Sequence, residues 1–119
     1  MATLTPTLTL TSTDATTDQL AFSVTDSLNI TGKVISPSRV VTSTGDLTLF
    51  ASSSYSRSYV YLKNMDDTIA MDVDFGSTAS FNIRPGEFAF FPWDYAGDIY
   101  AECENADGTT LEYFLFDRG

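Results

Sequence analysis

The side chains that could do acid–base or metal chemistry in this 119-residue chain are carboxylates, because the sequence contains 16 Asp and Glu residues and no His. The absence of His excludes the commonest general base, the Ser–His and Cys–His dyads and most zinc sites. Hydrolysis of a glycosidic bond needs two carboxyl groups at a set separation, one of them with a raised pKa. The candidate glutamates are Glu87, Glu102, Glu104 and Glu112. Glu102 and Glu104 alternate with Ala101 and Cys103, which is typical of the solvated face of a strand. A small sandwich without cleft-building insertions is also a poor enzyme scaffold, and we predict that the protein is not an enzyme.

Two pairs of aspartates could instead hold a hard cation. Asp66 and Asp67 fall in one predicted turn, whereas Asp72 and Asp74 share one face of a predicted strand. Calcium takes about six to eight oxygen ligands, usually from a loop that wraps around the ion, and the sequence has no D-x-[DN]-x-[DN]-G loop. We therefore interpret these carboxylates as a solvated surface, with a weak calcium site as the alternative. No metal and no cofactor are predicted.

The charge balance restricts the class of partner. Six Lys and Arg residues against the 16 acidic ones give a formal net charge of −10. Nucleic acids and anionic membranes bind clustered cations, which this sequence lacks. Its apolar runs also stay far below the roughly 18 residues of a membrane-spanning helix. We predict neither a nucleic-acid nor a membrane partner.

The single cysteine and the first residues bear on the compartment. Cys103 shares a predicted strand face with Ile99 and Ala101, so we expect a small buried side chain rather than a reactive thiol. One cysteine cannot form an internal disulfide, which is typical of a reducing cytoplasm. The start of the chain has neither the basic nor the apolar segment of a signal peptide. We therefore expect synthesis in the cytoplasm, which does not by itself fix the final location.

The elements that would position these residues are β-strands. Apolar and polar residues alternate with a period of two, threonine is abundant, and an apolar stripe at helical spacing never exceeds one turn. The predicted strands are 3–10, 20–25, 28–34, 40–42, 46–51, 59–63, 69–75, 80–84, 88–91, 99–104 and 110–116. With breaks every 8–12 residues or so, they predict an all-β protein. Apart from the N-terminal strand, we expect an antiparallel β-sandwich, jelly-roll-like, of about eight to ten short strands with little or no helix.

Turn signals punctuate these strands. Arg84–Glu87 combines a proline with a glycine, Asn105–Gly108 ends in Asp-Gly, and Asn64–Asp67 is acidic. Each is interpreted as the turn of a β-hairpin joining the strands on either side. Pro37 in Ser36–Ser38 is expected to interrupt a strand.

The N-terminal segment is predicted to differ from the rest. We expect residues 1–18 to be an extended strand or arm followed by a polar linker, and residues 19–119 to be a single β-sandwich domain. Pro6 removes a hydrogen-bond donor in mid-strand, which suits an edge strand or an arm. As an arm, the segment could pair with the sheet of a neighbouring subunit.

Aromatic residues supply the candidate interface. In the strand after Glu87, Phe88 and Phe90 share one face and Phe91 lies on the other, so both faces are apolar. Such strands suit either a central position in the core or a subunit interface. The residues predicted to form an interface are Leu4, Leu8, Leu10, Tyr59, Tyr61, Phe91, Trp93 and Tyr95. The alternative is a sugar-stacking platform made of Trp93, Tyr95 and Tyr55, and the sequence leaves open whether Trp93 points inward.

The C-terminal half also carries a family resemblance. Its segments are Leu62-Lys63-Asn64 at a strand end, an acidic turn, Ile69-Ala70-Met71-Asp72-Val73, then Arg84-Pro85-Gly86-Glu87-Phe88-Ala89 and Leu111-Glu112-Tyr113-Phe114-Leu115-Phe116. This half resembles the small all-β virion proteins of tailed bacteriophages that decorate or cement capsids or sit at the neck and tail. The resemblance implies assembly rather than catalysis and brings no catalytic residues.

The resemblance yields the functional expectation. It implies a virion structural protein, first of all a capsid decoration or cement protein that binds the assembled shell. Its expected partners are the major capsid protein or other virion proteins, together with further copies of itself in a homo-oligomer for which a trimer is possible. The alternatives are a neck, tail or fibre-base component and, in a different class, a carbohydrate-binding β-sandwich module. The expected location is the virion.

Overall fold

The computed structural model describes residues 2–15, 17–31, 34–42, 44–45, 47–50, 57–75, 79–94, 98–103 and 108–118, and the side chains of 34–41 and 79 are not described. Within these residues the chain is all-β and has no helix, as the sequence predicted. The search of the same part for a helix able to cross a membrane returned none.

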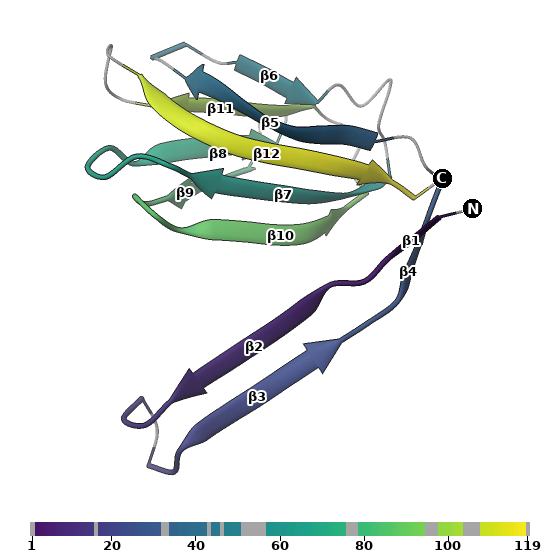
Figure 1. The fold of residues 1–119 in the computed structure, drawn as a ribbon. Coiled ribbons are helices and arrows are strands. Elements are labelled where there is room, and N and C mark those ends of the chain that lie inside the picture. The colour runs from purple at the N-terminus through teal and green to yellow at the C-terminus, as the bar shows by residue number, and fades with distance from the viewer. Residues whose placement is uncertain are drawn as a thin grey trace.

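Twelve strands make up the described part of the chain, against the eight to ten expected. They are β1 (Ala2–Leu4), β2 (Thr7–Ser12), β3 (Leu20–Thr25), β4 (Leu28–Ile30), β5 (Val34–Thr42), β6 (Leu47–Phe50), β7 (Ser58–Asn64), β8 (Met71–Phe75), β9 (Ala79–Ile83), β10 (Phe88–Trp93), β11 (Ile99–Cys103) and β12 (Thr109–Asp117). Strands β5 to β12 form two four-stranded sheets, in the orders β10-β7-β12-β5 and β6-β11-β8-β9. The two sheets lie face to face as a sandwich (Figure 1).

The strand order is that of a jelly roll. The pairs β8–β9, β7–β10, β6–β11 and β5–β12 nest inside one another, and successive pairs alternate between the two sheets. The segment from β5 to β8 therefore runs antiparallel to the segment from β9 to β12, like one long hairpin wrapped into two layers. This arrangement is the jelly roll of capsid and lectin domains, and it agrees with the predicted fold class.

All three predicted hairpins are wrong as strand pairings. The neighbours β7 and β8, β9 and β10, and β11 and β12 each lie in different sheets. Of the predicted turn Asn105–Gly108, residues 105–107 lie outside the described residues. The turn at Arg84–Glu87 does form, because the Glu87 amide donates to the Arg84 carbonyl at 3.0 Å and Gly86 takes a φ of 80°. A turn signal is local and predicts only that the chain reverses. Which sheet the next strand joins depends on residues far away in the sequence.

Pro37 does not interrupt its strand. β5 continues through it at the edge of its sheet, with a shift of register opposite β12 between Tyr113 and Leu115. An edge strand tolerates proline, since the missing amide hydrogen lies on the unpaired side or at an irregularity. The predicted break is therefore wrong.

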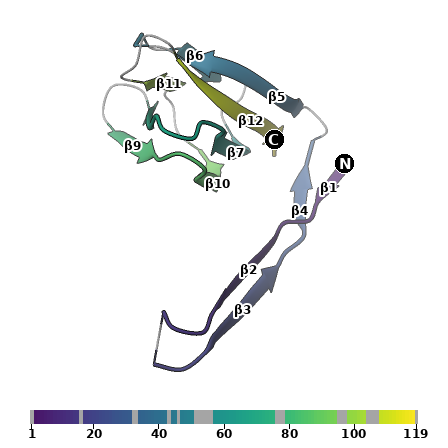
Figure 2. The same ribbon diagram turned by 60° about the vertical axis from the view of Figure 1, so that its left-hand side comes forward.

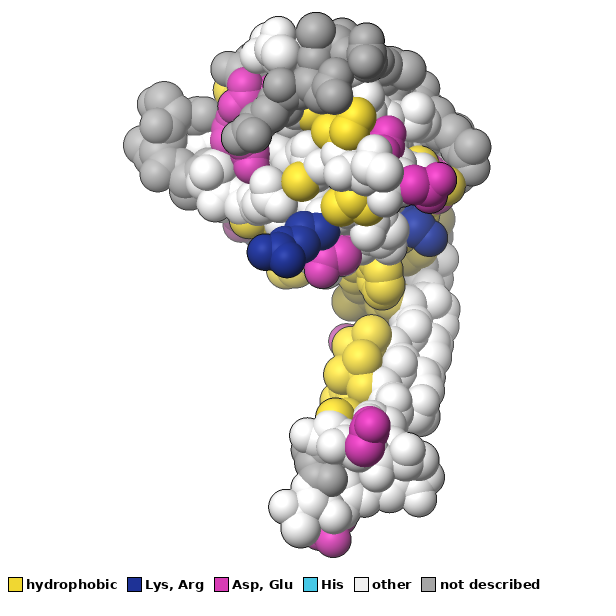
Figure 3. All heavy atoms as spheres, turned by 90° about the vertical axis from the view of Figure 1, so that its left-hand side faces the viewer, with side chains coloured by type: hydrophobic (Ala, Val, Ile, Leu, Met, Phe, Trp, Pro, Cys, Tyr) yellow, Lys and Arg dark blue, Asp and Glu magenta, His cyan; other side chains and the backbone are white. Residues whose placement is uncertain are grey.

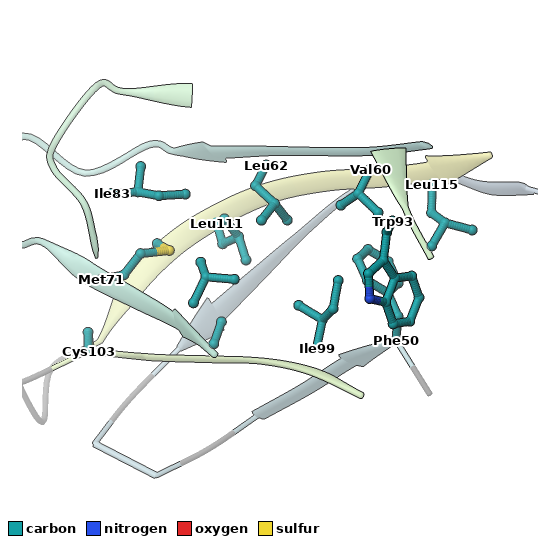
Figure 4. Packing of buried hydrophobic residues seen from close by; sticks show 12 residues of the cluster. Phe50, Val60, Leu62, Met71, Ile83, Trp93, Ile99, Cys103, Leu111 and Leu115 are labelled. Atoms are coloured by element: carbon teal, nitrogen blue, oxygen red, sulfur yellow. The ribbon is translucent and has the colours of Figure 1, made fainter. Parts of the chain in front are cut away.

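The core fills the space between the two sheets with the alternate residues of each strand (Figure 4). Its buried members are Phe50, Val60, Leu62, Met71, Val73, Ile83, Trp93, Ile99, Ala101, Cys103, Leu111 and Leu115. The prediction of a buried Cys103 is confirmed, and its thiol lies 3.4 Å from the Thr42 carbonyl as a weak donor. The period of two thus assigned the inward positions correctly in β8 and β11, whereas both faces of β7 are apolar and the period alone does not choose between them.

Strands β1 to β4 form an arm that leaves the sandwich (Figure 2). β1 pairs with β4 and β2 pairs with β3, both antiparallel, and the Asp26 amide donates to the Pro6 carbonyl at 3.2 Å between the two pairs. The arm is therefore one kinked β-hairpin over residues 2–30. Its base is fixed to the sandwich by the Thr31 amide, which donates to the Asp117 carbonyl at 2.8 Å.

The predicted boundary at residue 18 is therefore misplaced. β3 was assigned to the sandwich, but it returns along β2, so the arm includes residues up to Ile30. Alternation in Leu20–Thr25 predicts a strand with one apolar face and does not say which surface that face meets. The polar segment read as a linker contains the end of β2, where the Ser12 hydroxyl accepts from the Asp14 and Ala15 amides at the start of the turn toward β3.

The turn after β7 yields a prediction about pH. The Asp66 carboxylate accepts from the amides of Thr68 at 2.8 Å and Ile69 at 3.0 Å, and these bonds hold its pKa below the ordinary value. A lowered folded-state pKa stabilises the fold above the unfolded pKa of about 4, and this contribution is lost as the pH falls through the folded value. Asp66→Asn should therefore lower the urea midpoint at pH 7, with the difference from wild type shrinking toward pH 3.

Asp67→Asn is the matched control for this pH series. Asp67 lies in the same turn, but its carboxylate accepts none of those bonds. We expect its midpoint to follow the wild type at both pH values. An Asp66→Asn difference that is equally large at pH 7 and pH 3 would contradict the assignment of charge-dependent stability to Asp66.

Candidate functional site

The outer face of the sheet β10-β7-β12 is aromatic. Because Val60, Leu62 and Leu115 point into the core, the residues between them point outward. The side chains that we call the aromatic face are Tyr59, Tyr61, Phe88, Phe90, Phe114 and Phe116. Strand register brings them together, with Phe90 and Phe114 both opposite Tyr61.

The rings of the aromatic face pack against one another. Tyr61 stacks on Phe114 with ring centroids 4.3 Å apart and on Phe88 at 6.3 Å, while Tyr59 stacks on Phe90 at 6.3 Å. Such cross-strand aromatic pairs stabilise a sheet and hold the rings in fixed orientations. The result is a rigid apolar platform outside the core.

The arm has one apolar face and one hydroxyl face. Leu8 lies opposite Val24 and Leu10 lies opposite Phe22 on one side of the hairpin, which we call the arm's apolar face. On the other side the Thr7 and Thr25 hydroxyls are hydrogen-bonded at 3.0 Å. The alternating Leu and Thr residues at 7–10 thus build a two-stranded ribbon with two chemically distinct faces.

The arm and the aromatic face enclose an open groove of about 700 Å³. Its lining residues are Leu4, Pro6, Thr7, Leu8, Val24, Asp26 and Leu28 from the arm and Tyr59, Tyr61, Phe88, Phe90, Pro92, Phe114 and Phe116 from the sandwich. Figure 3 shows the apolar side chains following one side of the arm up to the sandwich. Asp26 is the one formally charged residue among these described lining residues.

Neither face is covered by the described part of the chain. Four large side chains on the arm keep 43–47% of their surface exposed, and Phe90 and Phe88 keep 40% and 60%. The arm residues are Leu8, Leu10, Phe22 and Val24. These six are the exposed large hydrophobic side chains of the described part, and all of them lie on these two faces. Contiguous apolar surface of this kind marks an interaction site.

Polar groups are confined to the edges of the aromatic face. The Arg118 guanidinium lies over the Tyr59 ring at 5.5 Å and pairs with Asp94 at 3.3 Å, and Asp94 also pairs with Arg57 at 3.7 Å. Burial, then the charge of Glu112 and a hydrogen bond to it, raise the pKa of Tyr61. The Tyr61 hydroxyl is therefore neutral, and the face remains uncharged.

The structure separates the predicted interface residues into three groups. Leu4, Leu8, Tyr59 and Tyr61 line the groove, and Leu10 lies farther out on the arm's apolar face.

Two predicted interface residues lie elsewhere, and one is not described. Trp93 is 3% exposed and belongs to the core, and Phe91 packs against that core from the same face of β10. Both therefore point away from the groove, because inward and outward positions alternate along the strand. Tyr95 lies outside the described residues, as does Tyr55 of the sugar-platform alternative.

Sequence reasoning missed about half of the site. Phe88 and Phe90 were recognised as one face of a strand but not chosen, and Phe22 and Val24 were assigned to the sandwich. Phe114 and Phe116 alternate with Tyr113 and Leu115, so the period of two contained their signal. The pattern does not indicate which of the two apolar faces of a strand points outward.

The carboxylates do not gather into a site. The Asp72 carboxylate accepts from the Asn82 amide at 2.8 Å on the outer face of the other sheet, where Glu102 lies opposite Asp72 in register. Glu87 instead binds the Arg84 amide at 2.8 Å, and Glu112 lies next to Tyr61. Glu104 lies outside the described residues. A search of the described residues found no group of three or more His, Cys, Asp or Glu side chains placed to hold a metal ion.

Comparisons with protein-family models, with curated proteins and with solved structures gave no match.

Proposed function

We propose that this chain is a non-enzymatic structural protein of a tailed-bacteriophage virion, of the capsid decoration or cement type, which assembles through the groove and its two faces. The observation that carries the assembly role is the pair of uncovered apolar faces, one on the arm and one on the sandwich. The virion setting is supported by the resemblance of the C-terminal half and by a jelly-roll topology that is widespread among capsid proteins.

The chemistry of the groove favours an assembly surface over a small-molecule site. Its lining is aromatic and aliphatic, and its polar groups are few, with Asp26, Thr7 and the tyrosine hydroxyls as the main ones. A sugar site needs several converging polar groups beside its stacking rings. The burial of Trp93 also removes one of the three rings that the carbohydrate-binding alternative used.

A decoration protein stabilises a shell by mass action. Copies that bind only the assembled shell lower its free energy relative to the dissociated coat subunits. The net charge of −10 keeps the free protein soluble and favours coat surfaces with basic patches. Neck or tail placement uses the same chemistry with a lower copy number.

Copy number per particle is the test. Particles purified from a culture that carries the gene are digested, and labelled peptides quantify this chain against the major coat protein. A ratio of one to a small integer is expected for a decoration protein. A few copies per particle, about a dozen by the symmetry of a neck or tail ring, would overturn the shell location in favour of the neck or tail. Absence from the particles would overturn the virion proposal.

A further inference from the structure

We propose that the occupant of the groove is a second copy of this chain, whose arm lies with its apolar face on the aromatic face of its neighbour. This proposal rests on the proposed function in one respect, namely that the groove is an assembly surface. It adds the partner and the contact, an exchange of arms that closes a small ring of copies.

The first argument is the stability of the arm. An isolated two-stranded hairpin is marginally stable in water, and it needs a surface against which to bury an apolar face. The four large side chains of the arm's apolar face instead keep 43–47% of their surface exposed. An ordered arm therefore needs a partner that covers this face. A second copy of the chain is such a partner, and it is present wherever the protein is made.

The second argument is the reach of the arm. Leu8 and Val24 line the groove, but the next pair along the hairpin, Leu10 and Phe22, is not part of its lining. The outer part of the arm extends beyond its own sandwich in both ribbon views (Figures 1 and 2). Within the described part of one chain, the aromatic face therefore does not cover Leu10 and Phe22. The aromatic face of a neighbouring copy, placed beside the first, can cover them.

The third argument is charge. Two copies of a protein with a net charge of −10 repel each other. Contact between copies is therefore least unfavourable where the surfaces that meet carry no charge. The arm's apolar face and the aromatic face are such surfaces, with Asp26 the one charged residue among the described lining. The charged residues beside the aromatic face, Lys63 and Glu112, lie opposite each other in register and have opposite sign, whereas the outer face of the other sheet carries the two acids Asp72 and Glu102 opposite each other.

The fourth argument is area. The six exposed side chains are 40–60% exposed, and at about 150–250 Å² for a large side chain they leave on the order of 500 Å² to be covered. Two copies that exchange arms would bury about 1,000 Å² from these residues alone. A stable interface needs about 1,200–2,000 Å², so the half-buried lining residues and the arm's backbone need to add little.

An exchange of arms would leave neither of the two faces uncovered. Sandwiches placed side by side around an axis roughly perpendicular to the aromatic face can each extend an arm over the next copy. Every arm then covers one face and every face receives one arm, in a closed dimer or trimer. Other occupants, such as a coat-protein segment, would have to supply both a ribbon and a face.

Sedimentation velocity of the purified chain tests the association. The wild type is expected to sediment as a dimer or trimer at micromolar concentration. Leu10→Asp on the arm and Phe88→Asp on the sandwich should each shift it to monomer, with at least a tenfold loss of affinity. Thr11→Asp adds the same charge to the hydroxyl face of β2, and Thr48→Asp adds it to the outer face of the other sheet. Both control variants should keep the wild-type mass.

Crosslinking shows whether the contact joins different chains. Leu10→Cys and Phe88→Cys are made on separate, differently tagged chains, which are co-expressed and treated with a short bismaleimide. A product containing both tags is expected, whereas Thr11→Cys with Phe88→Cys should give little. Cys103 is buried and does not compete in the folded protein.

Three outcomes would overturn arm exchange. They are a wild-type monomer at 100-fold higher concentration, an oligomer that survives both Asp substitutions, or a crosslink formed only within a chain that carries both cysteines. None of them depends on virions. A monomeric chain that is still abundant in particles would therefore reject the exchange and leave the decoration role standing.

Discussion

Trp93→Ala should lower the free energy of unfolding by about 3–5 kcal/mol, the usual cost of deleting a buried tryptophan side chain. Trp93 is 3% exposed and packs against Phe50 with ring centroids 6.1 Å apart, so its removal leaves a cavity between the sheets. A domain of this size has a total stability of about 5–15 kcal/mol, so the loss is a large fraction. Urea unfolding followed by far-ultraviolet circular dichroism measures it, since Trp93 is the one tryptophan and its fluorescence disappears with the substitution.

Trp93→Phe is the matched control. The indole Nε1 is buried and has no hydrogen-bond partner in the described structure, so replacing it with a phenyl ring forfeits no hydrogen bond. We expect less than half of the alanine effect, because most of the packed ring volume remains. If Trp93→Ala leaves the unfolding midpoint unchanged but weakens self-association, the residue belongs to an interface and its placement in the core is wrong.

The arrangement of these aromatic residues shows what the sequence could and could not predict. Alternation correctly placed Val60 and Leu62 on one face of β7 and Tyr59 and Tyr61 on the other. It could not say which face of a two-sided strand meets the core, because both faces are apolar. For β10 the sequence left the orientation of Trp93 open, and the structure has Trp93 inside and Phe88 outside.

The positions of the strands could be predicted from the sequence, whereas the pairing of the strands could not. Period, β-branched residues and turn residues act within a few positions, and they placed β3, β7 and β11 within one residue of their ends. Jelly-roll pairing joins β5 to β12 and β6 to β11, which are separated by most of the domain. Local signals therefore favoured hairpins between neighbours, whereas burial of both inner faces selected the nested arrangement.

The arm illustrates the same limit. Leucines and threonines at 4–10 predicted an extended strand, and Pro6 suited a position outside a central sheet. The returning strand β3 has the same alternation as a sandwich strand, so its pairing with β2 was not detectable locally. That pairing turns Val24 and Phe22 toward the same side as Leu8 and Leu10, and Leu8 and Val24 then line the groove.

Asn64→Ala should destabilise the fold by about 3 kcal/mol or more, since it leaves several buried polar groups without partners at about 1–3 kcal/mol each. The fully buried Asn64 amide donates to the carbonyls of Ile69 at 2.9 Å and Ile83 at 3.0 Å. Its side-chain oxygen accepts from the Asp66 amide at 2.9 Å. These bonds tie the end of β7 to its crossing segment and to β9, so one side chain holds the two sheets together at this end.

Asn82→Ala is the comparison that isolates burial. Asn82 is exposed and donates one bond, to Asp72 at 2.8 Å, which water can replace. We expect a loss below about 1 kcal/mol for this variant under the same urea titration. Equal losses for the two alanine variants would contradict the buried role of Asn64. Asn64→Asp separates the two sides of the amide, because a carboxylate still accepts from Asp66 but cannot donate to Ile69 and Ile83. It should therefore be at least as destabilising as alanine at pH 7.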